Sequence, residues 1–341
     1  MDQAWLSQAP ALADLGLAPF VPRAPWWGGD LQTMRNFLVR ARVRLADHPH
    51  QRLELPLGDG SGDRLSGALG RPAAGIGAKP LVVLLHGLSG EETSFYMRRT
   101  AAHLLALGWP VLRLNLRGAG PSRALSRWHY HAGRSEDLGL AFAALPSALV
   151  AHGVVAAGYS LGANMLLKFL GEQGRRAPLR AAVAISAPLD LAGTARRLMR
   201  RRNALYQYYL LKYMRKEAVA PIAAVTGAER RAILAARSIW EFDDRFSAPR
   251  NGFAGATDYY ERSAARHYLA GIAVPTLVIH ALDDPWIPSE PYLDFVWRRN
   301  PNLIPLITAR GGHVGFEGGD RRTAWHDLAV ARFLETWVSR P

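Results

Sequence analysis

The sequence predicts an α/β fold with a mostly parallel central sheet that is flanked by helices and carries one helical insertion. Three observations support this fold class. Short apolar runs alternate with stretches of helical spacing along most of the chain, which is typical of a parallel sheet wrapped by helices. The run at 81–85, LVVLL, is apolar throughout, as expected for a strand covered on both faces. Between residues 191 and 271 the alternation stops.

The individual elements follow from hydrophobic periodicity and from the positions of glycine and proline. Residues 1–50 are expected to be irregular, because they are rich in proline and contain a Trp26–Gly29 turn. Residues 51–70 alternate in character and predict an antiparallel hairpin at a sheet edge. Further strands are predicted at 81–85, 111–115, 154–157, 182–185, 276–280 and 303–308. Helices are predicted at 95–107, 135–150, 161–173 and 322–338.

The predicted organisation is a single α/β core with an insertion. Residues 1–190 and 271–341 form the core, and residues 191–270 form a helical cap or lid over the sheet. The inserted stretch is basic and aromatic, with arginines at 196, 197 and 200–202 followed by tyrosines at 206, 208, 209 and 213. We expect it to lie over the sheet rather than to fold independently.

The composition excludes several classes of protein. With 49% hydrophobic and 21% charged residues the chain is an ordinary globular sequence, not a disordered, collagenous or coiled-coil one. It has no cysteine, which excludes a disulfide scaffold, a thiolate metal site and a cysteine nucleophile. No closely spaced set of histidine or carboxylate ligands occupies one element, so we expect no metal.

The net charge favours anionic partners. Forty-two Lys and Arg against 28 Asp and Glu give +14, which suits nucleic acid or acidic lipid headgroups. No zinc-finger spacing or RNP signature supports nucleic acid. We therefore expect a solvated basic surface, with weak association with an anionic membrane surface as the alternative. The N-terminus lacks a basic secretory region, and the uncharged stretch 138–167 is interrupted by Pro146, Gly153 and Gly158, so we expect a cytoplasmic protein.

The segment Gly158-Tyr159-Ser160-Leu161-Gly162 predicts a catalytic nucleophile. It follows a short apolar strand and opens a helix, the context in which G-x-S-x-G forms a sharp strand-to-helix turn. Glycines at 158 and 162 relieve crowding at that turn. Ser160 is then presented above the carboxyl end of the sheet, and the helix N-terminus behind it favours developing negative charge.

A serine hydroxyl needs a base to accept its proton, and His313 is the candidate. It lies in Gly311-Gly312-His313-Val314-Gly315-Phe316, a glycine-rich loop after the last predicted strand. It also follows both the serine and the acid candidates in the chain, the order expected for this arrangement. The other histidines lie in loops, strands or helices without such a context; His86 is expected to shape a loop and His280 to be packed in the core.

The acid that orients the histidine is expected in the loop after the strand 276–280. Asp283 and Asp284 both occupy this loop and cannot both face the imidazole. Asp190, after an earlier strand, is a third option. The acid would hold the imidazole in the correct tautomer and stabilise the imidazolium.

An oxyanion hole is expected from two backbone N–H groups. Leu88, in the glycine-containing turn after the strand 81–85, would supply one, and Leu161, directly after the nucleophile, would supply the other. Because both donors belong to the main chain, their side chains need not be polar.

These motifs resemble the α/β-hydrolase fold, and more narrowly the YheT-like branch, the AB hydrolase 4 family of ABHD1- and ABHD3-type esterases. The resemblance spans about residues 22–335 and includes Trp26–Thr33, which is similar to the family's GxLQT stretch. Its other segments are His86–Gly90, Leu116–Gly118, Tyr130–Gly133, Asn164, Leu170–Glu172, Asp283–Pro285 and Gly311–Phe316. The resemblance implies a triad of Ser160, Asp284 and His313, so it selects Asp284 as the acid. It also implies carboxylic-ester hydrolysis without a cofactor.

The sequence therefore predicts a serine hydrolase that cleaves carboxylic esters through an acyl-enzyme. Its partner would be a small-molecule ester, and the aromatic insertion favours an apolar acyl or alcohol group. Two alternatives stay open: an acyltransferase or thioesterase with the same triad, and a lipid-surface-binding protein whose basic stretch Arg196–Lys216 lies on an anionic interface.

Overall fold

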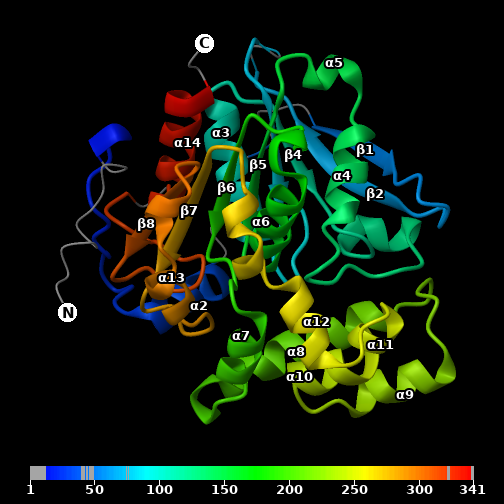
Figure 1. The fold of residues 1–341 in the computed structure, drawn as a ribbon. Coiled ribbons are helices and arrows are strands. Elements are labelled where there is room, and N and C mark those ends of the chain that lie inside the picture. The colour runs from blue at the N-terminus through cyan, green and yellow to red at the C-terminus, as the bar shows by residue number, and fades with distance from the viewer. Residues whose placement is uncertain are drawn as a thin grey trace.

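The computed structural model describes residues 13–39, 43, 45, 50–73, 75, 77–320 and 323–338. Within these residues one sheet of eight strands has the order β1-β2-β4-β3-β5-β6-β7-β8 (Figure 1). The strands are β1 (His50–Pro56), β2 (Arg64–Gly70), β3 (Leu81–Leu85), β4 (Val111–Leu114), β5 (Val154–Tyr159), β6 (Ala181–Ile185), β7 (Thr276–Ala281) and β8 (Leu303–Thr308). β1, β2 and β4 pair antiparallel, and all other neighbours are parallel. The mostly parallel sheet and the edge hairpin are confirmed.

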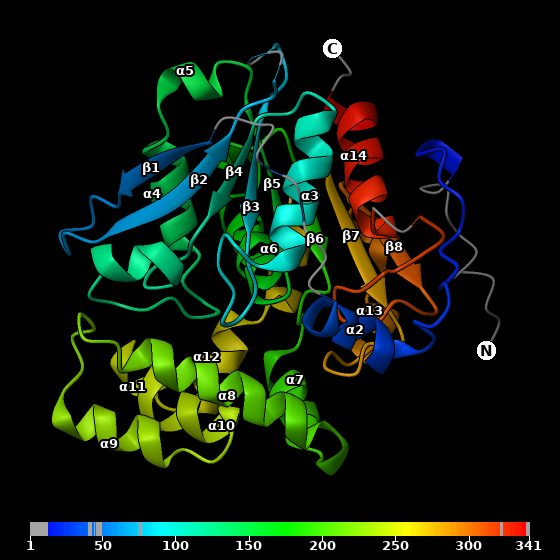
Figure 2. The same ribbon diagram turned by 180° about the vertical axis from the view of Figure 1, so that it is seen from behind.

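Helices cover both faces of this sheet. Those of the core are α2 (Gly29–Leu38), α3 (Phe95–Ala106), α4 (Glu136–Ala143), α5 (Ser147–Val150), α6 (Leu161–Gln173), α13 (Glu290–Asp294) and α14 (Trp325–Val338), with short 3₁₀ turns at η2 (Gly120–Leu125), η3 (Gly174–Arg176) and η8 (Trp297–Arg299). Figures 1 and 2 show α4 and α6 on one face and α3 and α14 on the other.

The core is divided between these two faces by the period of the strands. In β3, Leu81, Val83 and Leu85 pack in the cluster shared with α4 and α6, whereas Val82 and Leu84 pack in the cluster shared with α3 and α14. All five side chains are fully buried. An uninterrupted apolar run is therefore needed here, because successive side chains enter two different cores.

The order of the strands brings two loops together. β3 lies between β4 and β5, so the chain winds outward to β4 and then crosses back to β5. The loops after β3 and β5 leave the carboxyl edge of the sheet side by side at this reversal, where open α/β sheets form their binding crevices.

The expectation that residues 1–50 are irregular is wrong for α2. This helix buries its polar side, with Gln32, Thr33 and Arg35, and turns apolar side chains outward. The usual amphipathic pattern is reversed, so hydrophobic periodicity gives no reason to expect a helix packed on a core. Residues 1–12 lie outside the described part of the chain.

The expected helix 135–150 is also wrong as one element, since it divides into α4 and α5. Pro146 lies between them; its ring and missing N–H are incompatible with a continuous helix. The closing helix begins at Trp325 rather than 322, and residues 321–322 lie outside the described part of the chain.

Residues 186–275, all of which are described, contain helices and turns but no strand. The helical elements of the inserted segment (residues 191–270) and of its junction with β7 are α7 (Leu191–Leu198), η4 (Arg201–Asn203), α8 (Ala204–Ala218), α9 (Gly227–Ala235), α10 (Ile239–Phe242), η5 (Asp243–Ser247), α11 (Ala248–Arg250), α12 (Ala256–Ser263), η6 (Ala265–His267) and η7 (Leu269–Gly271). Figures 1 and 2 show α7 to α12 grouped at one end of the sheet, where the parallel strands finish. No helix in the described residues has the length and apolar character needed to cross a membrane.

Candidate active site

Ser160 occupies a sharp turn between β5 and α6. Its backbone has φ +50°, a left-handed conformation that non-glycine residues seldom adopt. A Cβ at Gly162 would overlap the carbonyl oxygen of His86, and one at Gly158 would lie 2.7 Å from the backbone of Ala163. Both positions therefore require glycine, because the turn presses β3, β5 and α6 together.

The structure brings the three candidate triad residues together from three separate loops. His313 Nε2 lies 2.9 Å from Ser160 Oγ, and His313 Nδ1 lies 2.7 Å from Asp284 Oδ2. An ionised carboxylate can only accept hydrogen bonds, so Nδ1–H donates to Asp284 and Nε2 is left to accept the serine proton. Trp286 packs on the imidazole, with ring centroids 4.4 Å apart.

Asp284 is buried, and both of its carboxylate oxygens accept hydrogen bonds. Its Oδ1 accepts the backbone N–H groups of Trp286 and Ile287 at 2.8 and 3.0 Å. Burial alone would raise the pKa of Asp284, but the adjacent His313 ring and these hydrogen bonds hold that pKa below its usual value. The carboxylate is therefore ionised when it contacts the imidazole.

The two rival acids lie elsewhere. Asp283 Oδ1 accepts the N–H of Gly312 at 2.8 Å, so this side chain fastens the backbone next to His313 rather than its ring. Asp190 caps the N-terminus of α7 by accepting the N–H of Gly193 and pairs with Arg266. Neither carboxylate is bonded to the imidazole.

The two candidate oxyanion donors flank Ser160. Leu161 is the first residue of α6, so its N–H has no acceptor within the helix. Leu88 follows Gly87, whose Cα carries no side chain at a point where a Cβ would lie 3.0 Å from Ser160 Cβ. Both leucines line the same cavity as Ser160 and His313.

Two other buried histidines, His86 and His280, have structural surroundings, as expected. His86 Nε2 accepts the N–H of Leu116 at 3.0 Å, and its Nδ1 lies 2.8 Å from the carbonyl oxygen of Gly87. His280 stacks on Tyr292 with ring centroids 3.8 Å apart. Burial lowers the pKa of each ring to about 4, so both are neutral and fill space.

Helix α2 holds the His313 loop, a role that the sequence did not reveal. Thr33 Oγ1 accepts the N–H of His313 at 2.8 Å, and Asn36 Nδ2 donates to the carbonyl of Val314 at 2.9 Å. Gln32 Oε1 accepts the N–H of Glu317 at 2.7 Å. The only available signal was the Leu-Gln-Thr stretch at 31–33, whose partners lie about 280 residues away and leave no local pattern.

A buried charge cluster lies beneath the same loop. The Glu317 carboxylate pairs with Arg23, Arg35 and Arg99, and Arg99 also pairs with Asp327 of α14 at 2.9 Å. Burial of unpaired charge is costly, so these contacts fix the positions of the elements that meet there. The cluster ties α2, α3 and α14 to the segment that follows His313.

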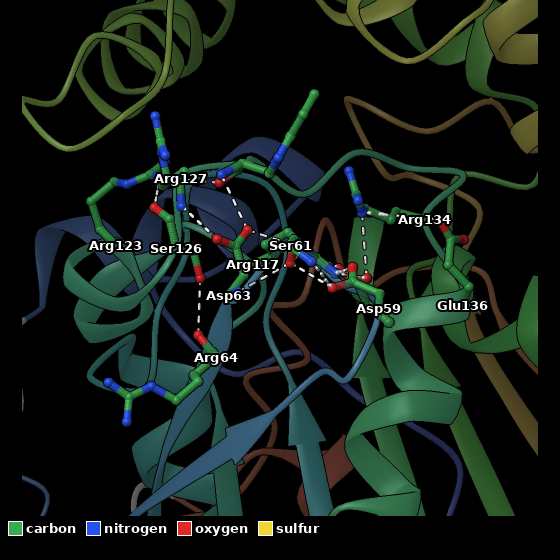
Figure 3. Close-up of polar contacts among 12 residues, drawn as sticks. Asp59, Ser61, Asp63, Arg64, Arg117, Arg123, Ser126, Arg127, Arg134 and Glu136 are labelled. Atoms are coloured by element: carbon green, nitrogen blue, oxygen red, sulfur yellow. Dashed lines mark hydrogen bonds and ion pairs between the residues drawn. The ribbon is translucent and has the colours of Figure 1, made fainter.

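A second buried cation, Arg117, lies among the side chains of the β1–β2 turn and the loop after β4 (Figure 3). The Arg117 side chain is completely buried and pairs with Asp59, Asp63 and Asp137 at 2.7 to 3.0 Å. The carbonyl of Arg117 accepts the N–H of Tyr130 at 2.7 Å. This arginine thereby joins the β1–β2 turn, the loop after β4 and α4 to the segment that carries Tyr130.

Ser160 and His313 open onto a cavity of about 480 Å³. Its walls are largely apolar and are supplied by the inserted segment, including Leu191, Leu198, Leu210, Met214 and Phe242. Acidic side chains also face it. Burial raises the pKa of Glu217 to about 8 and that of Asp243 to about 6, despite hydrogen bonds from Tyr130 and Tyr260, respectively.

The inserted segment is bonded directly to the acid loop. Arg197 Nη2 of α7 donates to the carbonyl of Asp284 at 3.0 Å, and Asn203 Nδ2 donates to the carbonyl of Pro285 at 2.9 Å. In the described residues no cluster of three or more His, Cys, Asp or Glu side chains is arranged to hold a metal ion.

Comparison with known proteins identifies the family and the class of enzyme. Residues 80–320 match the model of the alpha/beta hydrolase fold family. The chain is 33% identical to YheT of Escherichia coli, a provisionally named esterase, over 94% of each chain. It is 29% identical to mouse phospholipase ABHD3 over 76% of this chain and 64% of that protein. It is also 29% identical to a yeast medium-chain fatty acid ethyl ester synthase/esterase over 75% of this chain and 62% of that one. Among solved structures, the Pyrococcus furiosus esterase Pf2001 shares the fold, with a TM-score of 0.59 and 20% identity over 89% of this chain and 96% of that one.

Proposed function

The chain belongs to the α/β-hydrolase family, as a carboxylesterase-type hydrolase, and from that premise we propose that it cleaves apolar carboxylic esters through an acyl-enzyme on Ser160. The observation that carries this proposal is the continuous contact from Asp284 through His313 to Ser160, with heavy-atom distances of 2.7 and 2.9 Å. A serine that is hydrogen-bonded to an oriented imidazole is the arrangement used for acyl transfer.

In the first half of the proposed reaction, Ser160 Oγ attacks the ester carbonyl carbon while its proton passes to His313 Nε2. The carbonyl oxygen becomes an oxyanion, which accepts hydrogen bonds from the N–H groups of Leu88 and Leu161. His313 then delivers its proton to the alcohol oxygen as the C–O bond breaks. The alcohol departs, and the acyl group remains on Ser160.

In the second half, water attacks the acyl carbon and gives its proton to His313. The oxyanion collapses, His313 returns the proton to Ser160, and the carboxylic acid leaves. Asp284 stays ionised throughout and stabilises the imidazolium. Water is the only co-reactant that this sequence of steps requires.

The substrate is proposed to carry an apolar acyl chain. Leu191, Leu198, Leu210 and Met214 of the inserted segment line the cavity beside Ser160, so residues 191–270 would act as a cap that desolvates the bound chain. The names of the relatives are consistent with this class, since they include a phospholipase and a medium-chain fatty acid ethyl ester synthase/esterase.

Replacement of Ser160 by alanine tests the assignment. The Ser160→Ala protein should fold with an unchanged circular dichroism spectrum, lose at least about a thousandfold in kcat on p-nitrophenyl esters, and no longer react with a fluorophosphonate probe. Ser186→Ala is the control for the labelling: Ser186 has the same left-handed backbone (φ +52°) directly after β6, but its Oγ accepts the N–H of Val314 at 3.2 Å, so this variant should still react with the probe. Continued fluorophosphonate labelling of Ser160→Ala would show that another residue is the nucleophile.

The acyl acceptor can be examined in the same assay. The yeast relative is named both as a synthase and as an esterase, so transfer to an alcohol is the second candidate function. Adding ethanol to the ester assay and measuring ethyl ester against free acid separates the two. Predominance of the acid would support hydrolysis, and predominance of the ethyl ester would support acyl transfer.

A further inference from the structure

We propose that the outward faces of α2 and α8 form a docking face that binds an anionic lipid surface and sets the mouth of the cavity against it. The docking face consists of Trp27, Leu31, Met34, Phe37 and Leu38 in or next to α2, and Leu205, Tyr208 and Tyr209 of α8. Binding to the surface does not depend on catalysis; the delivery of a lipid ester from that surface rests on the proposed function.

Helix α2 is amphipathic in the reverse sense. Its inward side holds Gln32, Thr33 and Arg35, which bind the His313 loop and the buried charge cluster. Its outward side carries Leu31, Met34, Phe37 and Leu38 at helical spacing, each with more than a third of its surface exposed. An apolar stripe of this kind facing water indicates that something apolar covers it.

Helix α8 extends the stripe across the gap between core and inserted segment. Leu205 is 84% exposed and Tyr208 is 68% exposed, and both lie on the same side of the helix. The two helices are joined at Asp30, which pairs with Arg202 at 2.7 Å and accepts a hydrogen bond from Tyr206 at 3.1 Å. In Figure 2, α2 and the inserted segment lie at the same end of the molecule.

The docking face borders the cavity at two of its residues, Phe37 and Tyr209. The rings of Phe37 and Tyr209 meet edge to face, with centroids 5.2 Å apart. Both rings line the cavity, and they are 44% and 40% exposed, so they form part of its mouth. A lipid chain that leaves a bilayer at this point would reach Ser160 without crossing open water.

The charges around the docking face select an anionic surface. Arg201, Lys212 and Lys216 are exposed in or next to α8, and no ion pair links them to a carboxylate of the described residues. Asp30, the acidic residue in α2, is already paired. Basic residues beside an anionic bilayer are each attracted to it, and Trp and Tyr favour the headgroup region.

The same charges disfavour a second copy of the chain as the occupant. Two copies that met through this face would bring their basic clusters together, and like charges juxtaposed across an interface are repulsive. An anionic lipid surface instead satisfies both the apolar stripe and the cations. We therefore infer that the docking face binds a lipid surface rather than a second copy of the chain.

The test is cosedimentation of the intact protein with vesicles of phosphatidylcholine alone or of phosphatidylcholine mixed with phosphatidylglycerol. The double variant Leu31→Ser/Leu205→Ser removes apolar area, and Lys212→Glu reverses one charge; none of these residues lines the cavity. Leu107→Ser and Arg175→Glu are matched controls, since both residues are exposed at the opposite end of the sheet.

Wild type and both controls should bind the mixed vesicles more tightly than pure phosphatidylcholine. The double variant and Lys212→Glu should lose about tenfold in partitioning. Hydrolysis of a soluble short-chain ester by the double variant should stay unchanged, which separates surface binding from catalysis.

Three results would overturn the proposal. Wild-type protein could ignore the phosphatidylglycerol content, or the double variant could bind as wild type does. Light scattering could instead reveal a dimer that the double variant dissociates, which would identify the face as a contact between two copies. Because vesicle binding is measured without turnover, an inactive but vesicle-bound protein would contradict the proposed function and leave the docking face in place.

Discussion

Thr33 shows how a residue outside the proposed triad controls the position of the base. Its hydroxyl donates to the carbonyl of Gly29 at 2.7 Å and accepts the N–H of His313 at 2.8 Å. The first bond fixes the hydroxyl on α2, and the second fixes the backbone of the histidine. The Thr33 hydroxyl therefore holds the backbone of His313 itself, and this fixes the position from which the imidazole contacts Ser160.

Replacing Thr33 by valine keeps the shape of the side chain but removes the acceptor. The buried N–H of His313 is then unsatisfied, and the imidazole is free to shift from Ser160. We expect kcat to fall on the order of tenfold with little change in KM, because small displacements of a reacting group are costly.

Thr33→Ser is the control for this prediction, since it retains the hydroxyl and should restore most of kcat. Steady-state kinetics with one p-nitrophenyl ester would compare the three proteins. If valine and serine reduced kcat equally, the hydroxyl would have no positioning role and only the packing of the methyl group would matter.

Among the elements, those that were predicted well are those whose local pattern and tertiary role agree. β3 at 81–85, α6 at 161–173 and β8 at 303–308 begin and end where the sequence predicts. β3 faces two apolar cores, and α6 starts at a turn that its own glycines require. In such elements the local sequence pattern and the packing in the folded protein favour the same structure.

The elements that could not be predicted are held by distant polar contacts. α2 is stable because Gln32, Thr33 and Arg35 bond to residues near 317, and periodicity detects apolar burial rather than hydrogen bonds. Local sequence also could not identify the acid of the proposed triad. Spacing alone did not distinguish Asp283 from Asp284, and the choice of Asp284 rested on resemblance to a family.

Arg117 links three elements, so its loss should destabilise the fold rather than one loop. Arg117→Met would leave Asp59 and Asp63 without their cation and Asp137 with Arg134 alone, in a site where Arg117 itself is completely buried. Removing one partner of a buried ion pair typically costs about 3–5 kcal/mol in the free energy of unfolding. Urea unfolding measures this change.

The matched control is Arg64→Met, which breaks a pair with Glu54 in which both side chains are more than 40% exposed. Exposed pairs contribute about 1 kcal/mol or less, so this variant should unfold close to wild type. Equal effects of the two substitutions would mean that the Arg117 cluster contributes no more than a surface pair does.

At the scale of the whole molecule, the inserted segment is attached to the core through polar contacts that are buried around the cavity. Asn164 of α6 donates to the carbonyls of Ala132 and Ser263 and accepts the N–H of Ala265. Tyr130 of the core accepts the N–H of Ser89 at 2.7 Å and donates to Glu217 of α8 at 3.3 Å. Glu217 thus lies where the inserted segment contacts the core, and its protonation state affects this contact.

This junction makes stability depend on pH. Burial raises the pKa of Glu217 from 4.5 to about 8 in the folded protein. Between these values the folded state holds a proton that the unfolded state has released, so the contribution of Glu217 to stability falls as pH rises from about 4.5 through about 8.

Glu217→Gln cannot titrate and should gain stability relative to wild type across that window. Urea unfolding of both proteins at several pH values measures the difference. Tyr130→Phe keeps the carboxyl group and removes only a hydrogen bond that opposes the shift, so its stability should still fall as pH rises through this window. A difference between Glu217→Gln and wild type that stayed constant from pH 4.5 to 8 would mean that Glu217 is ionised in the folded protein and open to water.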